Sequence, residues 1–259
     1  MRRITFALVL VASSFGAAAA DGELTLVGGF DFGFKKLRLD FDRADNAFTP
    51  SFVTINPNIG WSYDSFYASL SYDKSISAES TSGVDTIFGL GTKTDYSRAD
   101  STFTLGYRIN PSFSLFAGYT HGVSKFNVTG TRLIVTDPNT NPPEVELFTN
   151  VTDIEFKETG PFAGAAFNTT FSNQSTLGLS IGYAKLDGEL SRRSQPSALT
   201  DFEVKGDTEG FSYGLTLSGP MTGSLGYRLG LKSTRYETDD LNGLTESYSS
   251  IYLGVMNFF

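Results

Sequence analysis

The chain has 259 residues and a net charge of −8, with 28 acidic and 20 basic side chains and no cysteine. Such an acidic chain is a poor partner for nucleic acid. The lack of cysteine excludes disulfides, thiolate catalysis and thiolate metal sites. Mean hydropathy is −0.11, and beyond the first 20 residues no apolar run approaches the ~18 residues of a transmembrane helix.

The N-terminal segment has the features of a secretory signal. Arg2 and Arg3 precede the apolar run 6–11, and alanines at 17–20 provide a small-residue cleavage site before Asp21. The run is too short to span a bilayer. The sequence therefore predicts a signal peptide over 1–20 and one domain over 21–259.

The rest of the chain alternates apolar and small polar residues with a period of two. In the first such segment Leu24, Leu26, Phe30, Phe32 and Phe34 share one face, and Gly29, Asp31, Gly33 and Lys35 share the other. The pattern recurs at 53–63, 66–72, 103–109, 113–119, 163–171, 177–183, 211–217, 225–231 and 251–259. These segments predict about ten strands.

The two faces decide between a soluble and a membrane protein. A soluble β-sandwich or secreted barrel needs a core, and the Gly, Ser and Thr face cannot supply one. In lipid, backbone groups are satisfied only within helices or closed barrels. The sequence thus predicts an all-β, antiparallel up-and-down transmembrane barrel with lipid on the apolar face.

The C-terminal strand carries a resemblance to a known class. The segment 251–259 alternates and ends on Phe259 as the last residue, as in Gram-negative outer-membrane β-barrel proteins, which this chain resembles. Asn257 departs from that pattern, because many of these proteins have an aromatic there. The resemblance implies a place in the cell outer membrane, contact with its lipids and lipopolysaccharide, and recognition of Phe259 by the barrel-assembly machinery.

The lengths of the connections orient this barrel. Short turns at 64–65, 110–112, 172–175 and 219–223 are expected on the periplasmic side, and long polar segments at 40–50, 75–100, 124–160, 187–208 and 236–246 on the extracellular side. Within the third, 125–136 and 144–156 are strand-like and predict a projecting hairpin. Two girdles of aromatic residues follow: Tyr63, Phe66, Tyr107, Phe113, Phe171, Tyr227 and Phe259 on the periplasmic side, and Phe103, Tyr119, Tyr183 and Phe211 on the outer side.

Basic residues gather at the expected extracellular rim. The outward phase of the strands reaches Lys36, Lys74, Lys125, Lys157, Lys185 and Arg235. Cations at that height are suited to the phosphates of lipopolysaccharide. The alternative is that they are general interface anchors with no selectivity.

The inward face bears on transport. Its small residues predict a narrow water column unless a loop folds in, since an eight-stranded barrel is just wide enough for side chains to fill. The expected lumen charges are Asp31, Lys35, Asp73, Arg108, Arg228 and Lys232. Glu158 is left aside because Gly160 and Pro161 interrupt the strand phase. These charges either pair across the lumen or favour anions or zwitterions.

The leading functional hypothesis is a narrow porin-like channel for small polar solutes. The alternative is a non-conducting surface barrel, adhesin-like or structural, that binds lipopolysaccharide or an extracellular partner through its loops. No enzymatic activity, cofactor or metal is predicted. The single histidine, His121, falls on the outer face, Asp239 and Asp240 lack a His partner, and Asp40, Asp42 and Asp45 lack the rest of a calcium loop.

Overall fold

The computed structural model describes residues 24–41, 49–76, 78–80, 93–137, 144–195, 201–238 and 244–259. The expected signal peptide, 1–20, lies outside them. The described chain is all-β, and it contains no helix long and apolar enough to cross a membrane. The strands are β1 (Leu24–Phe41), β2 (Ser51–Tyr63), β3 (Phe66–Ser75), β4 (Ala78–Ser80), β5 (Lys93–Asn110), β6 (Phe113–Asp137), β7 (Glu144–Thr170), β8 (Thr176–Gln195), β9 (Phe202–Thr222), β10 (Leu225–Thr238) and β11 (Leu244–Phe258).

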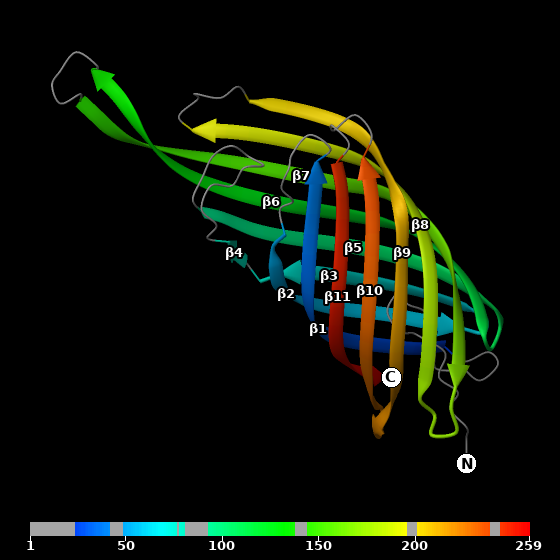
Figure 1. The fold of residues 1–259 in the computed structure, drawn as a ribbon. Helices are drawn as coiled ribbons and strands as arrows, with labels where there is room; N and C mark the ends of the chain where they lie inside the picture. Colours follow the sequence, from blue (N-terminus) through cyan, green and yellow to red (C-terminus); the bar gives the residue numbers. More distant parts are fainter. Residues whose placement is uncertain are drawn as a thin grey trace.

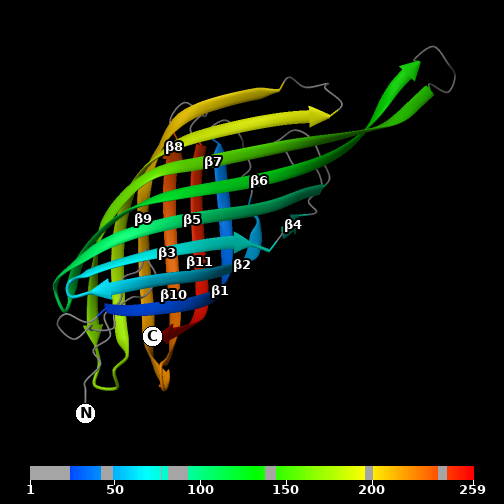
Figure 2. The same ribbon diagram turned by 180° about the vertical axis from the view of Figure 1, so that it is seen from behind.

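Ten of these strands form one closed antiparallel barrel (Figures 1 and 2). Strands that follow one another in sequence are paired, except that β3 pairs with β5 and not with β4, and the pairing of β1 with β11 closes the ring. The short β4 is an additional strand on β5. Val27 pairs with Phe258, so β1 starts at the end of the barrel where β11 stops. The predicted fold class and the count of about ten strands are confirmed.

Tight turns connect strands at the end where β1 begins. Asp64 has a φ of 53° and Gly223 a φ of 56°, in the left-handed region that two-residue hairpin turns require. The last of these turns is shorter than predicted. β9 continues through Pro220 to Thr222, with a register shift opposite Leu225, and only Gly223 and Ser224 form the turn.

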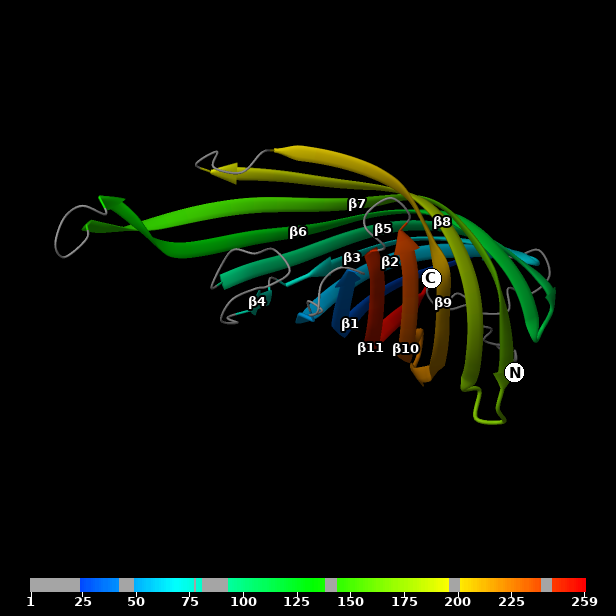
Figure 3. The same cartoon turned by 45° about the horizontal axis from the view of Figure 1, so that its top comes forward.

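At the other end the strands run far into segments that the sequence analysis took for loops. β5 begins at Lys93, β8 continues to Gln195 and β9 begins at Phe202, so the predicted loops 75–100 and 187–208 are too long. The predicted hairpin is present: β6 and β7 stay paired from Phe113 to Asp137 and project beyond the other strands (Figures 1 and 3).

The polarity of both strand faces reverses along β8. Leu179, Ile181 and Tyr183 are exposed on the outside, as expected for contact with lipid. Beyond Tyr183 the outward residues become Lys185, Asp187 and Glu189, whereas the inward Leu186 is buried. The same reversal occurs in β6, where the inward Phe126 and Val128 are buried. An apolar outside requires lipid and a polar outside requires water, so the reversal marks the upper edge of the membrane band.

We call the part of the barrel beyond Phe103, Tyr119, Tyr183 and Phe211 the projecting part. All four aromatics are exposed on the outer surface, as the predicted outer girdle requires. Tyr183 and Phe211 are cross-strand neighbours whose ring centroids lie 5.1 Å apart. The projecting part therefore has the alternation of a water-exposed barrel with an apolar interior.

Candidate functional site

The lowest charged layer inside the barrel is an ion pair between Asp31 and Arg228. Arg228 Nε donates to Asp31 Oδ1 over 3.0 Å, and its Nη2 donates to Oδ2. Asn58 Nδ2 also donates to Asp31 Oδ2, at 3.2 Å. Arg228 is 1% exposed and Asp31 is 5% exposed. The centroid of the Tyr252 ring lies 5.8 Å from Arg228 Cζ, so the layer consists of side chains of β1, β2, β10 and β11.

A small polar chamber lies above this layer. Lys35 Nζ is 3.0 Å from Asp73 Oδ2 and 3.6 Å from Asp100 Oδ2. Two cavities, of about 90 Å³ and 120 Å³, share Lys35, Asp73 and Lys232 in their linings. Lys232 makes no hydrogen bond or ion pair with another described residue. These volumes suit a few ordered water molecules between the charged groups.

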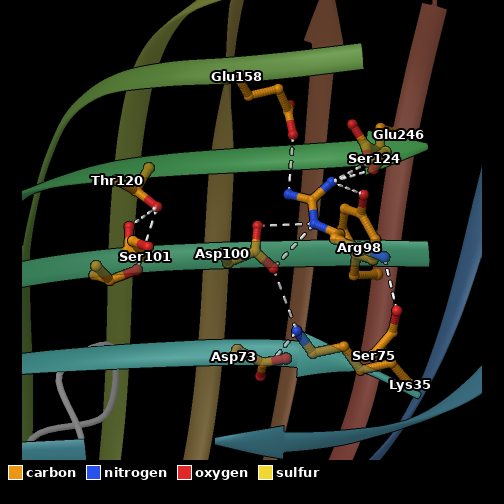
Figure 4. A network of polar contacts seen from close by, with 12 residues as sticks. Lys35, Asp73, Ser75, Arg98, Asp100, Ser101, Thr120, Ser124, Glu158 and Glu246 are labelled. Atoms are coloured by element: carbon orange, nitrogen blue, oxygen red, sulfur yellow. Dashed lines mark hydrogen bonds and ion pairs between the residues drawn. The ribbon is translucent and has the colours of Figure 1, made fainter. Parts of the chain in front are cut away.

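Arg98 is the centre of the upper charged layer (Figure 4). Its Nε lies 2.8 Å from Asp100 Oδ1, its Nη2 lies 3.0 Å from Glu158 Oε2, and its Nη1 lies 2.9 Å from Glu246 Oε1. Nη1 also donates to Ser124 Oγ at 3.0 Å. One guanidinium thus joins side chains of β5, β6, β7 and β11.

An apolar plug closes the interior of the projecting part. It is a single cluster of buried side chains from six strands, packed against Leu190 of β8 and Val204 of β9. Its members are Leu37, Leu39, Phe52, Tyr96, Phe126, Val128, Ile154, Phe156, Leu244 and Tyr248. Residues from eight of the ten barrel strands therefore meet in the interior.

Nearer the periplasmic end, large inward side chains cover the inward glycines. A Cβ atom at Gly106 would overlap the Tyr67 ring, one at Gly164 would overlap Phe116, and one at Gly230 would overlap Tyr252. The small residues are thus hollows that receive rings from adjacent strands. The predicted open water column is wrong for the described part of the barrel, because the sequence analysis overlooked the large residues that share the inward phase.

The predicted lumen charges are all on the inward phase, but at different levels. Asp31 and Arg228 form the lower layer, and Lys35, Asp73 and Lys232 line the chamber. Arg108 lies apart from them at the periplasmic end, where it donates to the Asp64 carbonyl oxygen.

The upper layer was not predicted from the sequence. Arg98 and Asp100 continue the inward phase of Thr104, but they fell within a segment read as a loop. Glu158 was left aside, although β7 keeps one register on both sides of Gly160 and Pro161, with Thr159 opposite Asp187 and Phe162 opposite Ala184. Extending each strand phase past the outer girdle would have found these residues.

The predicted basic rim faces outward, but much of it is already paired. Lys125 and Lys157 lie 2.9 and 3.0 Å from the two carboxylate oxygens of Glu155, and Lys157 also lies 3.3 Å from Glu189. Hydrogen bonds from these two lysines lower the pKa of Glu155, which lies in the projecting part. Lys185 lies 4.0 Å from Asp207.

The remaining rim residues differ from one another. Arg235 Nη2 lies 2.9 Å from Glu237 Oε1. Lys36 and Lys74, by contrast, are exposed and make no ion pair with any described residue. These two lysines are the most accessible to an anionic group at the rim.

Of the residues considered for catalysis or metal binding, His121 and Asp40 are among the described residues. His121 is on the outer face, with Nδ1 at 2.6 Å from Thr159 Oγ1. Asp40 pairs with Arg38, and Asp42, Asp45, Asp239 and Asp240 lie outside the described residues. Within those residues, no group of three or more His, Asp or Glu side chains is arranged to hold a metal ion.

Comparison with known proteins identifies the fold. No protein-family model and no curated protein matches the sequence. Among solved structures, the outer membrane protease OmpT from Escherichia coli is similar with a TM-score of 0.55 and 12% identity, covering 91% of this chain and 96% of OmpT. A Pseudomonas aeruginosa FadL homologue has a TM-score of 0.41 and 12% identity, with 91% and 90% covered.

A third similar structure is Ail, the attachment invasion locus protein of Yersinia pestis, with a TM-score of 0.38 and 13% identity, covering 93% of this chain and all 100% of Ail. At these identities the likeness concerns the fold alone. The chain has the fold of an outer-membrane β-barrel.

Proposed function

We propose that this outer-membrane-type barrel is a closed, non-conducting barrel of the cell outer membrane that acts through its projecting part. The observation that carries the proposal is the filling of its interior. The Asp31 and Arg228 layer, the Arg98 layer and the apolar plug follow one another along the axis. A solute would have to displace all three. The porin-like hypothesis from the sequence is therefore the less favoured one.

The proposal is tested by solute flux into lipid vesicles that contain the purified, folded barrel. Vesicles loaded with a large sugar and diluted into an isotonic solution of a small sugar swell only if the small sugar enters. The expected swelling rate is that of protein-free vesicles. A rate that rises with the protein content of the vesicles would contradict the closed barrel.

A second function concerns lipopolysaccharide. The support for it is the position of Lys36 and Lys74 at the extracellular rim, where their ammonium groups have no carboxylate partner among the described residues. In the proposed orientation this rim would meet the phosphates of the outer leaflet, and each basic residue near a charged membrane surface contributes about 1 kcal/mol of attraction. The paired Lys125 and Lys157 would first have to exchange Glu155 for a phosphate.

Binding of purified lipopolysaccharide to the detergent-solubilised barrel tests this second function. Lys36→Gln with Lys74→Gln should weaken binding more than Lys125→Gln does, and dephosphorylated lipopolysaccharide should bind the wild type and the double variant equally. If the double variant binds the phosphorylated form as well as the wild type, these lysines are general interface anchors.

The other expected associations belong to the same proposal. Recognition of Phe259 by the barrel-assembly machinery would deliver the chain to the outer membrane, and Phe259 is exposed beside the last strand. We assign no enzymatic activity, and the position of His121 on the outer face beside Thr159 supports that assignment. The projecting β6–β7 hairpin is the part best placed to contact an extracellular partner (Figure 1).

A further inference from the structure

The charges between the lower layer and the plug do not balance. Leaving aside Arg108 at the periplasmic end and Arg192 at the extracellular end, the inward cations here are Lys35, Arg98, Arg228 and Lys232. The inward carboxyl groups are those of Asp31, Asp73, Asp100, Glu158 and Glu246. Among the described residues of this region, the carboxyl groups exceed the cations by one. A buried unpaired charge is costly, so the excess needs a compensating partner.

The excess is located at Glu158 and Glu246. Each is 1% exposed and uses one oxygen to accept from Arg98. The other oxygens, Glu158 Oε1 and Glu246 Oε2, are buried and have no donor. The two carboxyl groups lie side by side on one guanidinium, Glu158 at 3.0 Å from Arg98 Nη2 and Glu246 at 2.9 Å from Arg98 Nη1. Two ionised carboxylates this close repel strongly, whereas a pair that holds one proton gains a hydrogen bond.

We propose that Glu158 and Glu246 share one proton in the folded barrel at neutral pH. The proton makes one carboxyl a donor to the other, and so it joins β7 to β11 across the interior. It also brings the net charge of the described side chains between the lower layer and the plug to zero. The shared proton thus completes the layer beneath the apolar plug and contributes to keeping the barrel closed.

The described groups around this pair already have other partners or carry no charge of their own, apart from Lys232, which is counted above. β5 contributes Arg98 and Asp100, and the Tyr96 hydroxyl lies 3.3 Å from Ser124 Oγ of β6. β11 contributes Tyr248, whose hydroxyl accepts from Arg98. Tyr236 and Lys232 of β10 line the adjoining cavity. Lys35 of β1 is already between Asp73 of β3 and Asp100.

Infrared spectroscopy tests the proposal on the intact wild-type barrel. At neutral pH exposed carboxyl groups are ionised, so a protonated carboxyl C=O band in the folded protein reports a buried acid. We expect such a band. Glu158→Gln and Glu246→Gln should each remove all of it, because the remaining carboxyl ionises next to Arg98. Glu155→Gln, on the outer face of β7, is the matched control and should leave the band unchanged.

The outcomes are distinct. Absence of the band in the wild type overturns the proposal. If stability then depends on sodium or calcium at fixed pH, a bound cation neutralises the excess carboxylate. Loss of the band in only one of the two Gln variants would show a single protonated glutamate and would overturn sharing. Neither result bears on whether the barrel passes solutes, which the vesicle experiment decides separately.

The pH dependence of stability gives a second test. An unfolded glutamate loses its proton near pH 4.3, whereas the folded pair keeps one. Above about pH 4.3 the folded state therefore binds the extra proton, and stability falls as pH rises until the pair ionises. We compare the unfolding equilibrium constant of the wild type with that of Glu246→Gln. Between about pH 4.3 and the pH at which the pair ionises, the ratio of the two constants should rise about tenfold per pH unit. Parallel curves for the two proteins would overturn the proposal.

Discussion

Arg228 and Asp31 meet above Gly254, which lies between them on β11. Gly254 pairs with Asp31 on one side and with Arg228 on the other, so the ion pair spans three adjacent strands. A Cβ atom at Gly254 would overlap the Asp31 carboxylate. The glycine therefore gives the two charged side chains room to cross β11 and join β1 to β10, the strands on either side of it.

Removal of one partner of this pair should destabilise the barrel strongly. Arg228→Met leaves the Asp31 carboxylate buried without its counter-charge, and such a change costs about 3–5 kcal/mol. Arg228→Met combined with Asp31→Leu removes both charges and should recover most of the loss. Urea unfolding from lipid vesicles measures the free energy of unfolding of the wild type, of each single variant and of the double variant. Additive costs in the double variant would show that the two side chains are not coupled.

Inward glycines should differ in their tolerance of a methyl group. Gly106→Ala forces the Tyr67 ring out of its place, and overpacking of this kind costs about 1–3 kcal/mol. Gly182→Ala is the matched control, because its nearest new contact is the Ser212 hydroxyl at 3.1 Å, which can rotate away. The measurement is the free energy of unfolding of each variant, which should fall more for Gly106→Ala than for Gly182→Ala. Equal costs would mean that the rings do not fill the interior as described.

The reversal of polarity along β8 predicts that arginine on the outer face of this strand costs stability in the membrane band but not in the projecting part. Leu179→Arg places a charge in the lipid band and should cost about 2–4 kcal/mol if the residue is near the bilayer midplane. Ser191→Arg, on the same face in the projecting part, should change the free energy of unfolding by less than about 0.5 kcal/mol. If both positions respond alike, the upper edge of the membrane band lies elsewhere.

The orientation of the barrel is open to a labelling experiment. The natural chain has no cysteine, so a single introduced thiol reports one position. Lys205→Cys, whose side chain is 69% exposed in the projecting part, should react with a membrane-impermeant maleimide on intact cells. Asn173→Cys, in the turn between β7 and β8, should react only after the outer membrane is permeabilised. The reverse pattern would invert the orientation.

The membrane band was predictable because lipid forces one apolar face on each strand, and residues such as Phe32, Leu179 and Leu229 follow a simple alternation. Of the projecting part only the β6–β7 hairpin was predicted, because water on the outside removes that pattern, and Arg98 and Asp100 were taken for loop residues. The filling of the interior depends on which ring faces which glycine. The pairing of Tyr67 with Gly106 follows from the register of β3 on β5, and one strand's alternation does not determine that register.

Single-channel recording in planar bilayers tests the closed interior most directly. Purified, folded wild-type protein should give no conductance steps above those of the bilayer alone. Arg228→Ala combined with Asp31→Ala should also give none, because the Arg98 layer and the apolar plug still close the barrel. Reproducible conductance steps from the folded wild-type protein would contradict the account and restore the narrow channel as its function.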